Sequence, residues 1–567
     1  LQGLALTGYA GYDPHYWSEK QFNNTWNEYV YNPSTQQYDV SPLGLDRTLN
    51  VTKGSTEVTT LHAELDYKRS FGKNNIDAFA AYEQSQDNYD YISAYRAGFV
   101  SGALPELFAG PQNVNTTNNE GTSYGGRINY FGRINYDYAN KYLASFTLRD
   151  DGSLNFAPGK RYGIFPSISA GWVMSEEPFM KDHLSFVNHL KLRASWGQMG
   201  NDNVGAYQYL ATYQFSGSNG QNGYTFGNNL TSVQGLVENA APNPNITWER
   251  AATTNLGLEA ILFKERLSFS LDLFRSERTN ILAARNLSVP DYTGLSLPQE
   301  NIGRVLNRGL EAQLSYHGTL SQDFSYNVAG NLSFARNKVQ FLDEAPGIPD
   351  YQKREGYPID AYVVYEADGL FQTKDQVSAY PHINQTMPGD VKLIDVNGDN
   401  VIDSKDQVRK YYGTTPEIVY GFNLDATYKR FSLSVFFQGQ ANAYLSIRPN
   451  LNFDQAFFYG RWQQEGDNRF PRIFMDKNSA AGESSYNSTF WLRNAGFLRL
   501  KNVYLSYDLP RDWMNTCHMS AGKFFLTAAN LFTIDQIKYF DPETNSSNGV
   551  GNFPILRTIQ VGLNLGF

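Results

Sequence analysis

The last ten residues of the chain, Thr558–Phe567, read TIQVGLNLGF. Every second residue from Ile559 to Phe567 is apolar, and the residues between them are polar or small. Successive side chains of a β-strand point to opposite faces of the sheet. The segment therefore predicts a strand with one apolar face and one polar face.

The same alternation recurs along the chain and predicts about 16 strands. In Leu267–Leu273, leucine and phenylalanine alternate with serine and aspartate. In Leu190–Trp196, the apolar residues alternate with Lys191, Arg193 and a serine. Charged residues on the second face indicate that this face meets water.

The lengths of the connections separate two architectures that fit such strands, a soluble β-sandwich and a membrane barrel. Short connections lie near 69–75, 138–141, 263–266, 317–323 and 428–431. Long polar connections lie near 97–119, 201–244, 283–300, 343–388 and 441–494. An outer-membrane barrel has short periplasmic turns and long extracellular loops. The sequence therefore predicts an all-β fold, a transmembrane antiparallel β-barrel with long extracellular loops.

Composition and charge argue against several other classes of protein. The chain has 567 residues and a formal net charge of −9, whereas a nucleic-acid partner would require a basic face. Cys517 is the single cysteine, so no internal disulfide can form. No segment has the roughly 18 consecutive apolar residues of a membrane-spanning helix. The seven histidines are scattered and no catalytic motif is present, so the chain is not predicted to be an enzyme.

A set of short strings lies in order along the chain. The strings are Arg149–Ser153 with Phe156, Gly159 and Arg161; Phe165–Ser167 with Ala170–Trp172; Leu192–Gln198; Trp248–Glu249; Asn301–Gly303 with Asn307, Gly309 and Glu311; Gly389–Asp390 with Asp395–Asp399; Leu498–Val503; and Asn530–Thr533. Together they resemble the SusC-like (RagA/SusC) TonB-dependent outer-membrane transporters of Bacteroidetes. Each string alone would be a weak motif, and their joint order makes the resemblance specific. It covers about Leu61 to Phe567.

The resemblance implies functions that cannot be inferred from the spacing of residues alone. Proteins of this family resemble 22-stranded barrels with an N-terminal plug, work with a SusD-like surface lipoprotein, and import glycans, or in some members peptides, with energy from TonB. Residues 1–567 are thus expected to be the C-terminal portion of such a barrel in the lipid of the outer membrane. The plug, the TonB-binding segment and the first strands are expected to be missing. A passive pore or surface-binding barrel is the alternative if the plug is absent in nature.

Residues 395–406 are the candidate metal site. Oxygen ligands for Ca²⁺ would come from Asp395, Asn397, Asp399, Asp403 and Asp406 and from the backbone carbonyl of Val401. These positions follow the spacing of an EF-hand loop in an extracellular connection. Asn400 and Asp406 depart from the usual glycine and glutamate. A turn held by side-chain to backbone hydrogen bonds without an ion is the alternative.

Aromatic residues beside the long connections have two interpretations. They belong to the aromatic girdle at the membrane surface, or they stack against sugar rings. Phe457, Phe458, Tyr459 and Trp462 are the candidate ligand-binding residues, for which neither interpretation is preferred. The terminal Phe567 resembles the assembly signal of outer-membrane barrels.

Overall fold

The computed structural model describes residues 3–42, 46–112, 116–215, 224–226, 231–233, 235–238, 241–285, 297–383, 385–448, 455–473, 486–537, 541–543 and 555–567. The chain divides into two compact units. The first unit comprises Leu1–Tyr136, Ser145–Pro166 and Gly200–Trp248, and the second comprises Asp137–Ala144, Ser167–Met199 and Glu249–Phe567.

Sixteen strands in the described residues follow one another in one antiparallel order, which confirms the predicted number. The order is β1 (Leu4–Asn23), β4 (Thr48–Phe71), β5 (Asn74–Ala97), β6 (Thr117–Tyr138), β7 (Tyr142–Ser153), β8 (Tyr162–Val173), β9 (Val187–Asn201), β14 (Glu249–Leu262), β15 (Leu267–Ala284), β16 (Gln299–Ser321), β17 (Phe324–Phe341), β22 (Ile418–Tyr428), β23 (Phe431–Ala441), β26 (Phe497–Asp508), β27 (Ala521–Asp535) and β28 (Thr558–Gly566).

Several strands begin earlier than the alternation predicts. β4 begins at Thr48 and β16 at Gln299, whereas the pattern indicated starts near Thr59 and Gly309. Both early starts lie at the ends that carry long connections. Polar and small residues such as Lys53, Gly54 and Ser55 interrupt the alternation of apolar and polar residues there, although the backbone pairing continues.

The first unit is built on β1, β4, β5 and most of β6. Leu4 pairs with Tyr67 and Thr48 pairs with Ala97, so these strands are paired along nearly their whole lengths. Short hairpins extend from them: β2 (Asn27–Asn32) with β3 (Gln37–Pro42), β10 (Tyr213–Phe215) with β13 (Leu236–Glu238), and β11 (Tyr224–Phe226) with β12 (Thr231–Val233). A 3-10 turn, η1 (Leu107–Ala109), follows β5.

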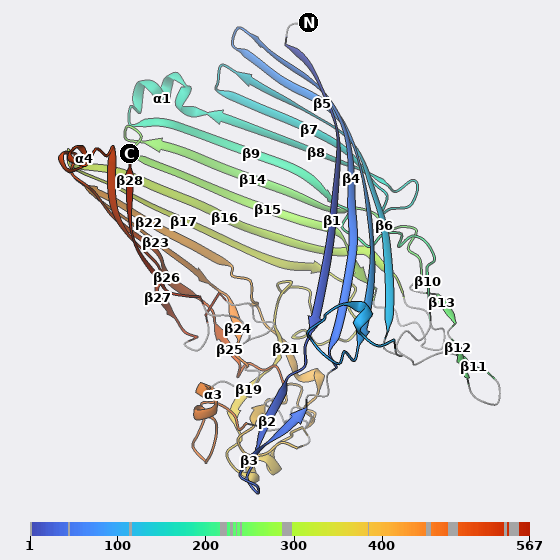
Figure 1. The fold of residues 1–567 in the computed structure, drawn as a ribbon. Helices are drawn as coiled ribbons and strands as arrows, with labels where there is room; N and C mark the ends of the chain where they lie inside the picture. Colours follow the sequence, from blue (N-terminus) through green and yellow to red (C-terminus); the bar gives the residue numbers. More distant parts are fainter. Residues whose placement is uncertain are drawn as a thin grey trace. The chain divides into compact units, whose positions relative to one another are not determined.

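In the second unit the long connections gather beyond one end of strands β14 to β27, and α4 (Arg511–Thr516) lies beyond the other end (Figure 1). The connections after β17 and β23 contain β18 (Val363–Tyr365), β19 (Ala367–Leu370), α2 (Lys374–Ala379), β20 (Val391–Leu393), η4 (Ser404–Asp406), β21 (Gln407–Arg409), β24 (Tyr444–Ser446), α3 (Gln455–Gly460) and β25 (Leu492–Asn494). We call these two connections, residues 342–417 and 442–496, the loop layer.

Two short helical segments, η2 (Met174–Glu176) and α1 (Pro178–His183), lie between β8 and β9. Glu177, between the two, accepts hydrogen bonds from the Tyr142 hydroxyl at 2.7 Å and from Trp172 Nε1 at 3.2 Å. These hydrogen bonds lower the pKa of Glu177. None of the helices in the described ranges has the length and apolar character needed to span a bilayer.

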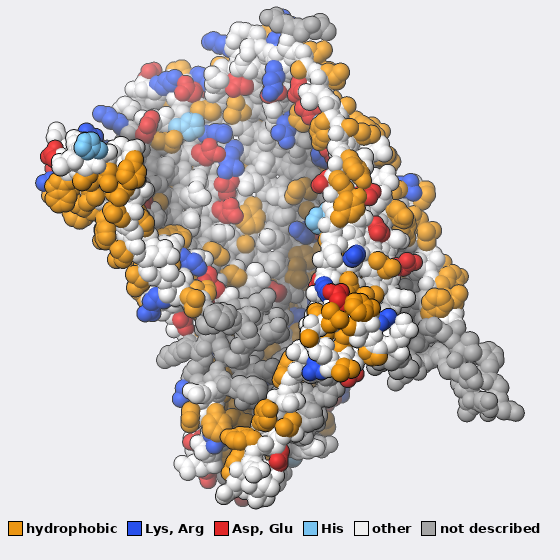
Figure 2. All heavy atoms as spheres, in the orientation of Figure 1, with side chains coloured by type: hydrophobic (Ala, Val, Ile, Leu, Met, Phe, Trp, Pro, Cys, Tyr) orange, Lys and Arg blue, Asp and Glu red, His pale blue; other side chains and the backbone are white. Residues whose placement is uncertain are grey.

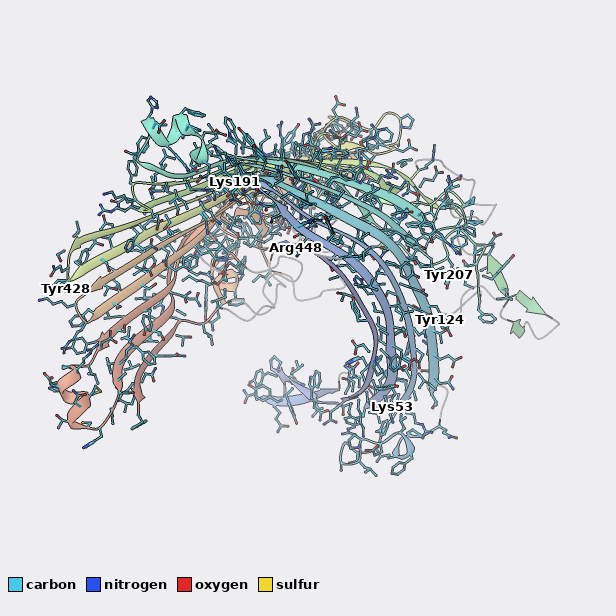
Figure 3. The ribbon with its side chains drawn as sticks, turned by 90° about the horizontal axis from the view of Figure 1, so that it is seen from above. Lys53, Tyr124, Lys191, Tyr207, Tyr428 and Arg448 are labelled. Atoms are coloured by element: carbon cyan, nitrogen blue, oxygen red, sulfur yellow. The ribbon has the colours of Figure 1, made fainter. Side chains whose placement is uncertain are left out.

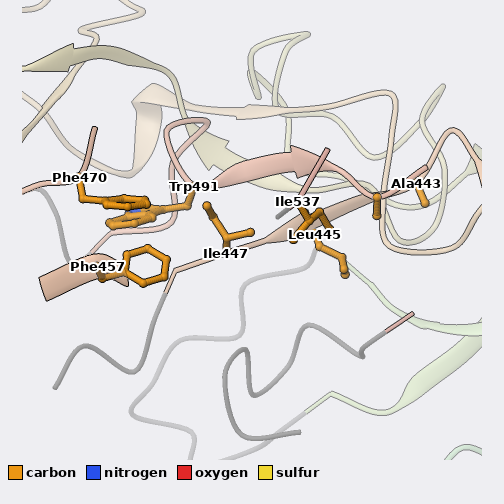
Figure 4. Packing of buried hydrophobic residues seen from close by; sticks show 8 residues of the cluster. Ala443, Leu445, Ile447, Phe457, Phe470, Trp491 and Ile537 are labelled. Atoms are coloured by element: carbon orange, nitrogen blue, oxygen red, sulfur yellow. The ribbon is translucent and has the colours of Figure 1, made fainter. Parts of the chain in front are cut away.

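The buried apolar clusters of the second unit lie in the loop layer and not between the faces of the sheet. One cluster contains Phe457, Phe470 and Trp491 and reaches Ile537 (Figure 4). The other contains Leu370, Val391, Leu393 and Ile402. The described parts of the long connections therefore have hydrophobic cores of their own.

Both faces of the strands carry side chains, and Tyr428 lies at the end of β22 (Figure 3). Hydrophobic side chains gather over α4 and the strands next to the C-terminus (Figure 2). Ile559, Val561 and Leu563 of β28 are exposed among them. An exposed apolar strand face of this extent is typical of a surface that meets lipid.

Candidate functional site

Several strings that carry the family resemblance meet around Trp248 in the first unit. The indole is 5% exposed, and its ring centroid lies 5.3 Å from those of Phe156 and Phe165. A Cβ added at Gly200 would lie 2.1 Å from the Phe165 ring, so only glycine leaves room for that ring. These residues are packed against one another, so the strings that contain them stabilise the fold.

An ion pair adjoins this cluster. Arg127 donates two hydrogen bonds to the carboxylate of Asp202, from Nε at 2.8 Å and from Nη2 at 3.1 Å. Asn155 donates to the backbone carbonyl of Asp202 at 2.9 Å. Burial alone would raise the pKa of Asp202, but the hydrogen bonds from Arg127 and Ser153 outweigh it and lower that pKa. The pair fixes the segment that follows β9.

A charged network lies on the polar face of the sheet in the second unit. Arg193 of β9 contacts Glu259 of β14 at 2.9 Å and Asp272 of β15 at 2.6 Å. Lys191 lies 3.6 Å from the same Glu259. A Cβ at Gly257 would lie 2.5 Å from Arg193 Nε, so the glycine makes space for the guanidinium group. The face that the sequence predicted to meet water is therefore ionic.

A groove of about 550 Å³ continues this polar face across the next strands. Hydroxyl and amide side chains from four strands line it: Ser268, Ser270, Gln313, Ser315, Asn331 and Asn423. Such side chains can donate and accept hydrogen bonds without carrying charge. The groove therefore suits water or a hydroxyl-rich solute.

Gly389 and Asp390 hold two parts of the loop layer together. Gly389 has φ +90°, a conformation that residues with a Cβ rarely adopt, and the Trp462 ring packs against it. The fully buried Asp390 accepts a hydrogen bond from Arg472 Nη2 at 2.9 Å and one from the backbone N–H of Met387 at 2.9 Å. The first long connection is thus tied to the second.

The candidate ligand-binding aromatics do not share one environment. Phe457 is 1% exposed and its ring lies 4.2 Å from that of Phe470. Trp462 is half-buried and donates from Nε1 to Gln372 Oε1 at 3.3 Å. Phe458 and Tyr459 are exposed, Tyr459 by 74%. Phe457 is thus a core residue in this structure, whereas a stacking role for Phe458 and Tyr459 stays a prediction.

The candidate metal loop is held by its own carboxylates. Asp395 accepts hydrogen bonds from the backbone N–H groups of Gly398 and Asn400, each at 2.8 Å. Asn400 has φ +64°, the left-handed conformation that asparagine tolerates. The fully buried Asp406 accepts from the backbone N–H groups of Val396 at 2.8 Å and Asp403 at 2.9 Å.

The remaining oxygens of this loop are also engaged. Asn397 Oδ1 accepts from the N–H of Asp399, and Asp399 Oδ1 accepts from the N–H of Val401, each at 2.9 Å. Lys405 Nζ lies 3.8 Å from Asp399 and 3.5 Å from Asp403. Across the residues that the structure describes, no group of three His, Cys, Asp or Glu side chains is arranged to hold a metal ion. The geometry matches the turn without an ion, and Ca²⁺ binding stays a prediction.

A buried charge cluster was not anticipated from the sequence. Arg499 of β26 is 2% exposed and forms two hydrogen bonds to Asp541, at 2.7 and 2.8 Å. It also pairs with Glu543, and Lys501 lies 3.4 Å from that carboxylate. The position of Arg499 between Leu498 and Leu500 is a local signal, but its partners lie more than forty residues further along the chain.

Phe567 follows the last strand and is 91% exposed. Its role as an assembly signal stays a prediction.

Comparisons with known proteins agree with this architecture. The sequence model of the family described as "TonB dependent receptor-like, beta-barrel" matches residues 4–531. The chain belongs to the TonB-dependent receptor β-barrel family. Members of this family are outer-membrane transport proteins and not enzymes, and the chain is an outer-membrane β-barrel protein.

Two curated relatives support the SusC-like branch of the TonB-dependent receptor family. TonB-dependent receptor P3 of Formosa agariphila is 29% identical over 546 residues, which cover 89% of this chain and 52% of the relative. TonB-dependent receptor SusC of Bacteroides thetaiotaomicron is 27% identical over 525 residues, which cover 89% of this chain and 49% of the relative. The chain spans about half the length of these relatives.

Among solved structures, the chain is similar to the RagAB peptide importer in its "open-open" state. The TM-score is 0.75 at 23% identity, with 100% of this chain and 59% of that chain covered. This likeness concerns the fold of the receptor barrel.

Proposed function

We propose that this chain forms the barrel wall and outer loops of a transporter that imports oligosaccharides, with energy from TonB and with a SusD-like lipoprotein at its outer face. Membership of the receptor family over residues 4–531 is the observation that carries the proposal. The hydroxyl and amide side chains that line the groove beside Ser268 and Asn331, together with Glu259 and His189, support a hydroxyl-rich cargo.

Import of peptides is the second candidate. The printed title of the similar RagAB structure names a peptide importer. The charged network of Arg193, Glu259 and Asp272 offers both signs of charge on the polar face, as the two termini of a peptide would require.

Uptake by living cells tests both candidates. Cells lacking the gene are compared with complemented cells for uptake of labelled oligosaccharides and of labelled peptides of equal mass. Loss of oligosaccharide uptake on deletion supports the first candidate, and loss of peptide uptake supports the second. A protonophore abolishes uptake that depends on TonB, whereas uptake that persists identifies a passive pore.

The lipoprotein partner is tested separately. Purification of the tagged receptor from detergent-solubilised outer membranes is expected to recover a SusD-like lipoprotein in a fixed ratio. Recovery of the receptor alone, in mild detergents that preserve other outer-membrane complexes, contradicts this part of the proposal.

A further inference from the structure

We propose that Arg354, Tyr357, Arg409 and Tyr411, in the connection between β17 and β22, form a binding site for an acidic oligosaccharide. The proposal rests on the proposed function, because it assigns a chemical class to the cargo. It is carried by a pair of stacked tyrosines that lies beside two arginines without carboxylate partners.

Backbone hydrogen bonds bring the four side chains together. The N–H of Tyr357 donates to the carbonyl of Arg354 at 3.2 Å, which closes a turn through Gly356 with φ +93°. The N–H of Arg409 donates to the carbonyl of Tyr351 at 2.7 Å, and its Nε donates to the carbonyl of Gln352 at 3.3 Å. The turn at Arg354 therefore lies beside the end of β21.

The two tyrosines form a platform. Their ring centroids are 4.2 Å apart and the rings are inclined by 21°. Tyr411 remains 68% exposed although Tyr357 covers one face of its ring. The other face is therefore open, and a flat aromatic face of this kind packs against the C–H groups of a pyranose ring.

The two guanidinium groups lack carboxylate partners. In the parts of the chain described above, neither Arg354 nor Arg409 forms an ion pair with Asp or Glu. Burial lowers the pKa of Arg409 and the positive charge of Arg354 lowers it further, whereas the charge of Glu344 and the Tyr357 hydroxyl act in the opposite direction. The stem of the Lys338 side chain passes beside Gly356. An anion between these groups would relieve their mutual repulsion.

The nearby carboxylates are already engaged. Glu344 accepts hydrogen bonds from the backbone N–H groups of Arg354 at 2.6 Å and of Glu355 at 3.3 Å. Glu355 accepts from the N–H of Leu342 at 3.2 Å. Asp350 pairs with Lys353 at 2.6 Å. Glu344 and Glu355 thus accept hydrogen bonds from backbone N–H groups, and in the described residues no carboxylate forms an ion pair with the guanidinium group of Arg354 or Arg409.

The combination of groups indicates the ligand class. Arginine binds carboxylate and sulfate through paired hydrogen bonds. An acidic sugar presents such a group on the same rigid ring whose C–H face can cover Tyr411. A neutral sugar leaves the arginines unused. An acidic peptide supplies the anion but no flat ring at a fixed distance from it.

Isothermal titration of the detergent-purified receptor with trigalacturonic acid and with neutral galactotriose tests the site. Binding of trigalacturonic acid is expected to weaken about tenfold in Arg409→Gln and in Arg354→Gln. Binding of trigalacturonic acid is expected to weaken in Tyr411→Ala as well. Tyr411→Phe keeps the aromatic ring and is expected to bind as the unaltered protein does. Lys353→Gln is the matched control, because this cation already pairs with Asp350, and it is expected to bind as the unaltered protein does.

Further ligands separate the alternatives. A sulfated galactan tetrasaccharide that depends on the same arginines supports an acidic-sugar site that also accepts sulfate. Equal affinity for galactotriose, or binding of tetra-aspartate as tight as that of trigalacturonic acid, overturns the proposal. Unchanged thermal unfolding of each variant shows that the loss is not one of folding.

The outcome is independent of the import assay. Variants that lose trigalacturonic acid binding in a receptor that imports neither sugars nor peptides leave the site standing and contradict the proposed function. Oligosaccharide import without any arginine-dependent binding contradicts the site alone.

Discussion

Trp248 donates its indole N–H to the backbone carbonyl of Arg161 across 2.9 Å, although 87 residues separate the two in the sequence. The hydrogen bond joins the segment before β14 to the segment before β8. It is a polar contact of an indole whose ring also packs against Phe156 and Phe165.

Replacing Trp248 tests how far this cluster supports the first unit. Trp248→Ala is expected to lower the free energy of unfolding by about 3–5 kcal/mol, because a buried indole is removed. Trp248→Phe retains a ring and loses the hydrogen bond, so a loss of about 1 kcal/mol beyond the change in ring size is expected. Urea unfolding of the protein in lipid vesicles measures both, and equal losses would contradict the separate role of the hydrogen bond.

The pair of Asp202 and Arg127 predicts a dependence of stability on pH. The pKa of Asp202 lies below its usual value of 3.8, so the pair stabilises the fold fully above that pH. The contribution is lost as the pH falls below 3.8 through the pKa of the folded state. Asp202→Asn is expected to remove this part of the acid dependence in unfolding measured between pH 5 and pH 2. An identical acid profile in the variant and the parent protein would refute it.

Arg499 and Lys523 form ion pairs in different surroundings. Arg499→Ala is expected to cost about 3–5 kcal/mol, because the buried guanidinium group is removed and the partly buried carboxylates of Asp541 and Glu543 lose their main cation. Lys523→Ala, which breaks an exposed pair with Asp508, is expected to cost at most about 1 kcal/mol. Denaturant midpoints compare the two, and similar losses would show that burial does not decide the strength of these pairs.

The candidate metal loop is tested by competition between Ca²⁺ and Lys405. Removing this cation from Asp399 and Asp403 in Lys405→Ala is expected to tighten Ca²⁺ binding, and Asp395→Ala is expected to abolish it. Calorimetric titration measures affinity and stoichiometry. No heat of binding in either the parent protein or Lys405→Ala supports the turn without an ion.

Phe457 and Tyr459, two residues apart, are expected to respond differently to truncation. Phe457→Ala opens a cavity in the loop layer and lowers the free energy of unfolding by about 3–5 kcal/mol. Tyr459→Ala leaves stability within about 0.5 kcal/mol, as exposed positions usually do. If Tyr459 stacks on cargo, the second variant weakens oligosaccharide binding measured by titration. Unchanged binding leaves Tyr459 as an exposed aromatic without a ligand.

The sheet was predictable because its chemistry is local. Alternation in segments such as Leu267–Leu273 identifies a strand without knowledge of its neighbours. The lengths of the connections indicate which end of each strand carries the short turns and which end carries the long loops. The early starts of β4 and β16 were not predictable, because polar and small residues interrupt the alternation in those parts of the strands. The pairing of these ends depends on neighbouring strands and not on their own pattern.

The site was less predictable for a related reason. Phe457 and Tyr459 look alike in the sequence, and only the packing of Phe470 and Trp491 separates a core ring from an exposed one. Arg354 and Arg409 carry no motif and meet through a turn and a tyrosine stack. Arg499 is marked by its apolar neighbours, but its partners could not be inferred.

The separate hydrophobic cores of the loop layer affect how much conformational entropy is lost when a ligand binds. A loop that becomes ordered only when its ligand arrives loses conformational entropy at that moment, which weakens binding. Here the rings of Phe457 and Trp491 and the buried Asp390 order the long connections when the chain folds. Exposed residues such as Tyr411 can therefore be exchanged one at a time to change selectivity, while the frame beneath them stays intact.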